Sequence, residues 1–157
     1  MNASQETELA VMPLAGYKNV WEYIQTLEYN DTQKILYLEQ QLYNLLKNHP
    51  EDINLLALLL HEQIMHNRGQ RARGIAYKIW ENGGEMDSKI EKMYFDDLIN
   101  LGLSDMVGAA MAPYIADMDN TVEEYGWLMT KYAVFSGNMS LLGSSVLQYI
   151  TNRKPPV

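Results

Sequence analysis

The 157-residue chain contains no cysteine, which excludes disulfide bonds, thiolate metal sites and cysteine nucleophiles. Its first residues have neither a basic start nor a long apolar run, so no secretory signal is expected. The longest purely apolar run covers residues 55–60, far short of the roughly 20 residues that span a bilayer. We therefore expect a cytoplasmic protein without membrane insertion.

Basic residues are also scarce. The chain has 12 Lys and Arg against 20 Asp and Glu, which gives a net charge of −8 and a pI near 4.8. This charge repels phosphate backbones and anionic lipids, so nucleic acid is not expected as a partner. The hydrophobic share of 47% and the length fit one domain with a large core.

Most catalytic patterns are missing as well. No serine lies in a nucleophile elbow, and the glycines of NRGQRARG at 67–74 lack the lysine and hydroxyl residue that complete a phosphate loop. The adjacent acids at 96–97 and 123–124 diverge by about 100° on a helix, so neither pair can share an ion. We therefore predict a protein that is not an enzyme and has no cofactor.

One segment, HEQIMH at 61–66, comes close to the helical zinc signature. His61 and His66 are five residues apart, so their directions on a regular helix differ by about 140° and they cannot share a tetrahedral ion. We predict no metal ligand here, with His61 near the apolar face and His66 near the helix end. A small helical enzyme or a metal- or ligand-binding bundle that uses His61, Glu62 and His66 remains the alternative function.

Apolar residues recur at helical spacing along the chain, which predicts an all-α fold with about eight helices. A flexible N-terminal arm over 1–16, one helical-repeat domain over 17–151 and a tail over 152–157 are expected. The predicted helices cover about 17–28, 31–49 with Asp31 as N-cap, 51–67, 70–82, a segment from Asp87 or Ser88 to 101, one with Ser104 as N-cap, one with Asn120 or Thr121 as N-cap, and 140–150.

A repeat of about 34 residues is visible in the turns. Glycines at 69, 102 and 137 each lie between a longer and a shorter helix, and a second glycine follows at 74, 108 and 143. Glycine costs about 1 kcal/mol in a helix interior relative to alanine, so its recurrence predicts close backbone approach. Six residues beyond each second glycine stands an aromatic residue, Trp80, Tyr114 or Tyr149, which we expect to fill the gap between hairpins.

This pattern resembles the tetratricopeptide repeat over about residues 51–150. The resemblance implies antiparallel helical hairpins stacked as a short right-handed solenoid, whose groove binds a segment of another protein. Adaptors, co-chaperones and the small acidic chaperones of bacterial secretion systems look like this. The family's first-helix pattern of Trp, Leu, Gly and Tyr has no good counterpart in LLALLLHEQIM, so a less regular helical bundle is the alternative.

Charged and aromatic residues give candidates for partner binding. Residues 68–92 carry six basic and four acidic residues, and Arg71 and Arg73 lie there either to meet acidic groups of a partner or as solvated surface. The resemblance puts Tyr94, Tyr125 and Tyr132 on the concave side, where they either recognise the partner or pack on the next helix. A homodimer through apolar surface on a terminal helix is a further option.

Overall fold

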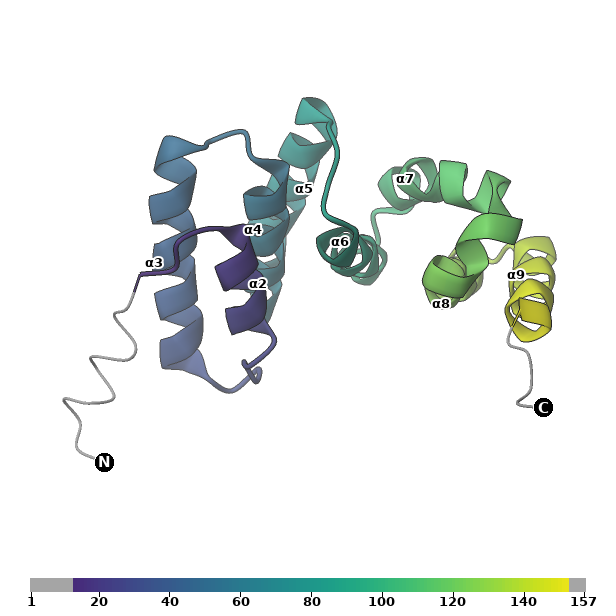
Figure 1. Cartoon of the computed structure of the whole chain (residues 1–157), viewed down its shortest axis with the longest axis horizontal. Helices are drawn as coiled ribbons and strands as arrows, with labels where there is room; N and C mark the ends of the chain where they lie inside the picture. Colours follow the sequence, from purple (N-terminus) through teal and green to yellow (C-terminus); the bar gives the residue numbers. More distant parts are fainter. Residues whose placement is uncertain (1–12, 153–157) are drawn as a thin grey trace. The chain divides into compact units, whose positions relative to one another are not determined.

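The computed structural model describes residues 13–152, apart from the side chains of Tyr149 and Asn152 (Figure 1). Every regular element in this range is an α-helix, which confirms the all-α prediction, and contacts between neighbouring helices fit a stack of helical hairpins. The right-handed path of a solenoid stays a prediction. The eight helices are α2 (Tyr17–Ile24), α3 (Thr32–Asn48), α4 (Ile53–Met65), α5 (Gly69–Asn82), α6 (Ser88–Asn100), α7 (Ser104–Ala116), α8 (Met118–Ser136) and α9 (Met139–Asn152).

Helix ends lie close to the predicted positions. The first helix stops at Ile24, four residues early, because the backbone N–H groups of Thr26 and Leu27 bond three residues back instead of four. Asp31 is the N-cap of α3 as predicted, but its Oδ2 accepts from the backbone N–H of Glu28 at 3.3 Å rather than from α3. The N-cap of α8 is Asp117, three residues before Asn120, the nearer of its two predicted positions, and the N-cap of α7 is Leu103 rather than Ser104. Residues 1–12 of the predicted arm and 153–157 of the predicted tail lie outside the described residues.

The chain divides into two compact units, Met1–Glu91 (unit 1) and Lys92–Val157 (unit 2), with the boundary inside α6. The prediction of a single repeat domain stays a prediction. Within residues 13–152 no helix combines the length and the apolar character that crossing a membrane requires.

Unit 1 is organised around α4, in which every residue from 55 to 60 is buried. α2, α3 and α5 all contact this helix. On α5 the fully buried residues that face it include Ala72 and Ala76, whose small side chains allow two helices to pack closely. Asp52 caps α4, because its Oδ1 accepts from the backbone N–H groups of Asn54 and Leu55 at 3.0 and 3.2 Å.

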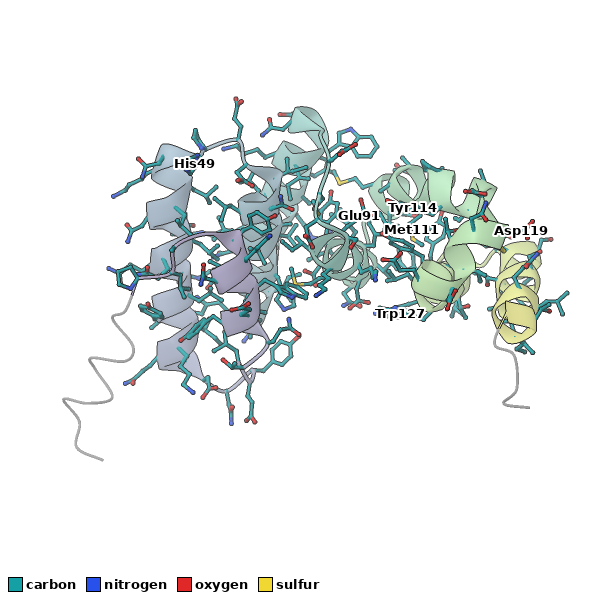
Figure 2. The ribbon with its side chains drawn as sticks, in the orientation of Figure 1. His49, Glu91, Met111, Tyr114, Asp119 and Trp127 are labelled. Carbon is teal, nitrogen blue, oxygen red and sulfur yellow. The ribbon has the colours of Figure 1, made fainter. Side chains whose placement is uncertain are left out.

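Unit 2 has an aromatic core. Tyr114 of α7 stacks on Tyr125 of α8 with ring centroids 4.3 Å apart, and Phe95 of α6 meets the ring of Tyr114 edge-on at 5.8 Å. Tyr114 and the buried Met111 both project from α7, whereas Trp127 of α8 is exposed (Figure 2). α8 also contacts α9, so it is the central helix of this unit.

Three turns share one geometry. The left-handed residues Asn67, Gly102 and Gly137 have φ of 58°, 73° and 70° and are spaced 35 residues apart. In each turn the N–H group of this residue donates to the carbonyl oxygen three residues earlier. The N–H group of the next residue donates to the carbonyl oxygen five residues earlier. This pair of bonds is the Schellman motif that ends many helices. The repeat is therefore 35 residues long, and Asn67 takes the place that the sequence pattern gave to Gly69.

The second glycines are not packed against other backbones, contrary to the prediction. A Cβ at Gly74 or Gly143 would meet nothing within 4 Å. A Cβ at Gly108 would lie 2.7 Å from Oη of Tyr132, which is a side chain. In the 35-residue register the counterpart of Gly108 in the first hairpin is Arg73, so the three glycines are not equivalent positions.

The three repeat aromatics also differ in burial. Trp80 is exposed, whereas Tyr114 is part of the aromatic core of unit 2. The side chain of Tyr149 lies outside the described residues. The expectation that one aromatic per repeat fills the same gap is therefore not confirmed.

Candidate functional site

The HEQIMH segment forms the end of α4 and the residue after it, and its two histidines have different surroundings. Glu62 and His66 are four residues apart and lie on one face, with Oε1 of Glu62 3.6 Å from Nδ1 of His66. His61 is half-buried and does not belong to this group of converging donors. The two histidines thus point apart, as their five-residue spacing predicts.

Glu39 completes the group from α3, and sequence reasoning missed it. Its Oε2 lies 3.0 Å from Nδ1 of His66. Donor atoms of Glu39, Glu62 and His66 all lie within 4.8 Å of one another. The available signal was the position of Glu39 inside the buried stripe of α3, between Ile35 and Leu42, because a charged residue in such a stripe needs a partner.

Two further side chains hold the carboxyl groups in place. Nη1 of Arg68 donates to Oε1 of Glu39 at 3.0 Å, and Nε2 of Gln63 donates to Oε2 of Glu62 at 2.5 Å. We call Glu39, Glu62, Gln63, His66 and Arg68 the carboxylate–imidazole cluster. It links the middle of α3 to the end of α4 and to the turn that follows.

Burial controls the protonation of the cluster. Glu62 is 0% exposed, and desolvation, assisted by a hydrogen bond and the charge of Glu39, raises the pKa of Glu62 to about 8. Although partial burial opposes it, hydrogen bonds from Glu62 and His66 and the charge of Arg68 lower the pKa of Glu39. At neutral pH Glu62 is therefore protonated and donates to the ionised Glu39. Oε1 of Glu62 is buried and accepts no hydrogen bond among the described residues.

A second feature of unit 1 is a solvent-open groove formed by α3, α4 and α5, with a volume of about 380 Å³. We call it the α3–α4–α5 groove. Gly74 adds no side chain to it, so the space above this residue is open. Tyr43, 41% exposed, stands on the α3 side. The lining residues are Tyr43, Leu46, Pro50, Leu56, Leu59, Arg71, Gly74, Ile75 and Lys78.

Charge distinguishes this groove from the other large hollow of unit 1. The other hollow, of about 510 Å³, lies between α2 and the start of α6 and is lined by two basic and two acidic residues, Lys18, Lys89, Glu22 and Asp87, among others. In the α3–α4–α5 groove the charged lining residues are Arg71 and Lys78, both basic. The groove therefore combines an apolar floor with positive charge, although the whole chain is acidic.

The structure separates the residues predicted to bind a partner. Arg71 lines the groove, whereas Arg73, about 200° further around α5, is half-buried and is not a lining residue. Tyr94 and Tyr125 are buried in unit 2, and burial raises the pKa of Tyr94 to about 12. Tyr132 is half-buried beside Gly108. Tyr94 and Tyr125 therefore pack inside unit 2. Of the five predicted residues, only Arg71 lines the groove.

Comparisons with known proteins add no relative. No protein-family model matches the sequence, and neither the curated proteins nor the solved structures contain a match.

Proposed function

We propose that this chain is a non-catalytic protein-binding module, an adaptor, chaperone or assembly subunit, that holds a segment of another protein in the α3–α4–α5 groove. The observation that carries the proposal is the lining of this groove, which combines apolar residues with two basic side chains and no acidic one. Grooves between helices that are apolar at the floor and polar at the edge suit amphipathic segments. The resemblance to tetratricopeptide repeats supports the same class of function.

The lining defines the chemistry of the partner. A fitting segment places an apolar side chain above Gly74 and an acidic side chain near Arg71 or Lys78. Apolar burial supplies most of the affinity, at about 25 cal/mol per Å² of area removed from water. The net charge of −8 opposes an acidic partner at a distance, but screening limits this repulsion to about 8 Å at physiological ionic strength. At contact the two basic groups therefore dominate.

Site-specific cross-linking tests whether the groove is the binding surface. A photoreactive amino acid replaces Tyr43, which is 41% exposed and lines the groove. The control carries the same amino acid at Tyr29, which is 70% exposed in the same unit but does not line the groove. We expect a partner captured from cell extract to be cross-linked from position 43 and not from position 29.

A substitution at Gly74, made in the chain that carries the photoreactive amino acid at position 43, tests the same point. Gly74→Leu fills the open space of the groove, whereas Gly74→Ala adds a single methyl group that meets nothing within 4 Å. We expect Gly74→Leu to remove the cross-link from position 43 and Gly74→Ala to retain it. Equal cross-linking from positions 43 and 29, or a partner that survives Gly74→Leu, contradicts binding in the groove.

The remaining expectations extend this proposal. We propose a cytoplasmic location, and a protein partner rather than nucleic acid because a net charge of −8 disfavours phosphate. A homodimer through the exposed apolar residues of α9 is the alternative protein contact, and sedimentation of the purified chain checks it. One observation, the carboxylate–imidazole cluster, favours metal binding as a second function, with His66 and without His61.

A further inference from the structure

Hydrogen bonds among the described residues leave a buried carboxyl oxygen atom of the carboxylate–imidazole cluster without a partner. Oε2 of Glu39 lies 3.0 Å and Oε1 of Glu62 3.6 Å from Nδ1 of His66. Most buried polar atoms in folded proteins have a hydrogen-bond partner. Oε1 of the fully buried Glu62 has none among the described residues, although it faces the imidazole. A ligand between the three side chains would provide the missing partner.

We propose that Glu39, Glu62 and His66 form a binding site for a divalent first-row transition-metal ion, with Zn²⁺ as the best-suited member. This site is independent of the α3–α4–α5 groove and shares no lining residue with it.

The distances between donors fit one ion. Zinc binds imidazole nitrogen and carboxylate oxygen at about 2.0–2.2 Å, so neighbouring ligands of a tetrahedral ion are about 3.3 Å apart. The observed separations of 3.0 and 3.6 Å lie on either side of this value. His66 and Glu62 share one face of α4, and Glu39 comes from the adjacent α3, so the backbone already brings the three donors together.

Neighbouring groups hold the carboxylates in the required orientation. Arg68 bonds Oε1 of Glu39, and Nε2 of Gln63 donates both to Oε2 of Glu62 and, at 3.4 Å, to Oε2 of Glu39. Oε2 of Glu39 and Oε1 of Glu62 are the oxygens that lie toward His66. Such outer contacts orient ligands in known metal sites. Metal binding would release the proton of Glu62, after which two carboxylates and the guanidinium of Arg68 sum to one negative charge, which a divalent cation more than balances.

The donor set also selects the kind of metal. One imidazole with two carboxylates suits Zn²⁺, Fe²⁺, Co²⁺ or Mn²⁺, whereas Mg²⁺ and Ca²⁺ prefer oxygen ligands alone. The side chains of Glu39 and His66 are 15% and 22% exposed, so the ion has a path from solvent. Three protein ligands leave one position for water, the ligand count of many zinc sites that are not purely structural.

Calorimetric titration of the chelator-treated full chain with ZnCl₂ tests the proposal. We expect one Zn²⁺ per chain in the wild type and a loss of affinity of about tenfold or more in Glu62→Gln and His66→Gln. The chain has three histidines, so His61→Gln and His49→Gln are matched controls that keep wild-type binding. His49 follows the last residue of α3 (Figure 2), whereas His66 follows the last residue of α4.

A second measurement keeps the test valid if a variant folds poorly. Wild-type protein with CoCl₂ should show a visible absorption band that saturates at one Co²⁺ and disappears on addition of Zn²⁺ but not of Mg²⁺. Circular dichroism confirms that each variant retains its helices. The absence of stoichiometric binding by the folded wild type, or binding that depends on His61 or His49 rather than His66, overturns the proposal. Either result leaves the groove function untouched, because the cross-linking test uses other residues.

Discussion

The α4–α5 hairpin of unit 1 and the α8–α9 hairpin of unit 2 close with the same turn but present different second helices. Asn67 and Gly137 occupy the same left-handed position, and the helix that follows begins two residues later in both. α5 carries three basic residues in its sequence, whereas α9 has no charged residue. On α9 the side chain of Leu147 is 66% exposed.

This difference shows that the turn geometry is common to the two hairpins, whereas the side chains on the outward face of the second helix vary. The turn and the helix spacing recur because they satisfy the last carbonyl groups of the first helix. The outward face of the second helix has no such constraint, so α5 acquires the basic edge of a groove while α9 acquires an uncharged apolar face. The side-chain chemistry of the second helix therefore differs between the two hairpins.

The first helices of the two hairpins are expected to differ in how their contribution to stability depends on pH. Five residues before the turn residue, α4 has the buried Glu62 and α8 has Tyr132. Because the folded state raises the pKa of Glu62 from 4.5 to about 8, folded protein holds this proton more tightly than unfolded protein. The contribution of Glu62 to stability is therefore greatest below pH 4.5 and falls as pH rises toward 8, by up to about 1.4 kcal/mol per pH unit.

Urea unfolding at several pH values between 5 and 8, with a chelator present, measures this effect. We expect Glu62→Gln to flatten the fall in unfolding free energy and to be more stable than the wild type at the upper end of the range. Tyr132→Phe in α8 serves as the control and should leave the pH dependence unchanged. Parallel curves for the wild type and Glu62→Gln would show that the burial of this carboxyl group is not linked to folding.

The turns provide a test of intermediate size. Gly137→Ala puts a side chain at φ 70°, and we expect a loss of about 1–2 kcal/mol in unfolding free energy. Asn67→Ala should lose less, because asparagine already carries a Cβ at φ 58° and only its better tolerance of this conformation is lost. Gly69→Ala is the matched control, since its Cβ meets nothing within 4 Å, and should change stability by less than about 0.5 kcal/mol. If Gly69→Ala is as harmful as Asn67→Ala, the turn register is wrong.

The second glycines give the smallest effect. Gly74→Ala in α5 and Gly143→Ala in α9 should each stabilise the chain by about 0.5–1 kcal/mol, because alanine is the better helix former and both sites are open. Gly108→Ala should gain less, because its Cβ would lie 2.7 Å from Oη of Tyr132. In a Tyr132→Phe background the full gain should return. Thermal unfolding of the single and double variants checks this coupling, and an equal gain at all three glycines contradicts it.

Sequence periodicity was sufficient for the secondary structure but not for the repeat register. The all-α fold and the N-cap at Asp31 follow from local patterns. The register was one to two residues off in the first hairpin because Asn67, rather than a glycine, adopts the left-handed conformation there. Asparagine tolerates this conformation better than other non-glycine residues, so a turn search limited to glycine misses it.

The candidate site was harder to predict from the sequence than the helices were, because it depends on contacts between helices. The spacing of His61 and His66 was enough to separate the two histidines, but the third donor, Glu39, comes from another helix. For Tyr125, helical spacing allowed both a recognition role and a packing role, and only the contact with Tyr114 decides between them. Residues two apart on one helix diverge by about 200°, so the separation of the two arginines of α5 was available from the sequence.

Affinity of the captured partner for Arg71→Glu and Arg73→Glu variants tests the central claim about the groove most directly. Both substitutions reverse the same charge on the same helix, but only Arg71 lines the groove. We predict that Arg71→Glu weakens binding by about threefold to tenfold, the size expected for one charge at the edge of an interface, and that Arg73→Glu does not. Equal affinities for the two variants, or a larger loss with Arg73→Glu, would contradict partner binding in the α3–α4–α5 groove.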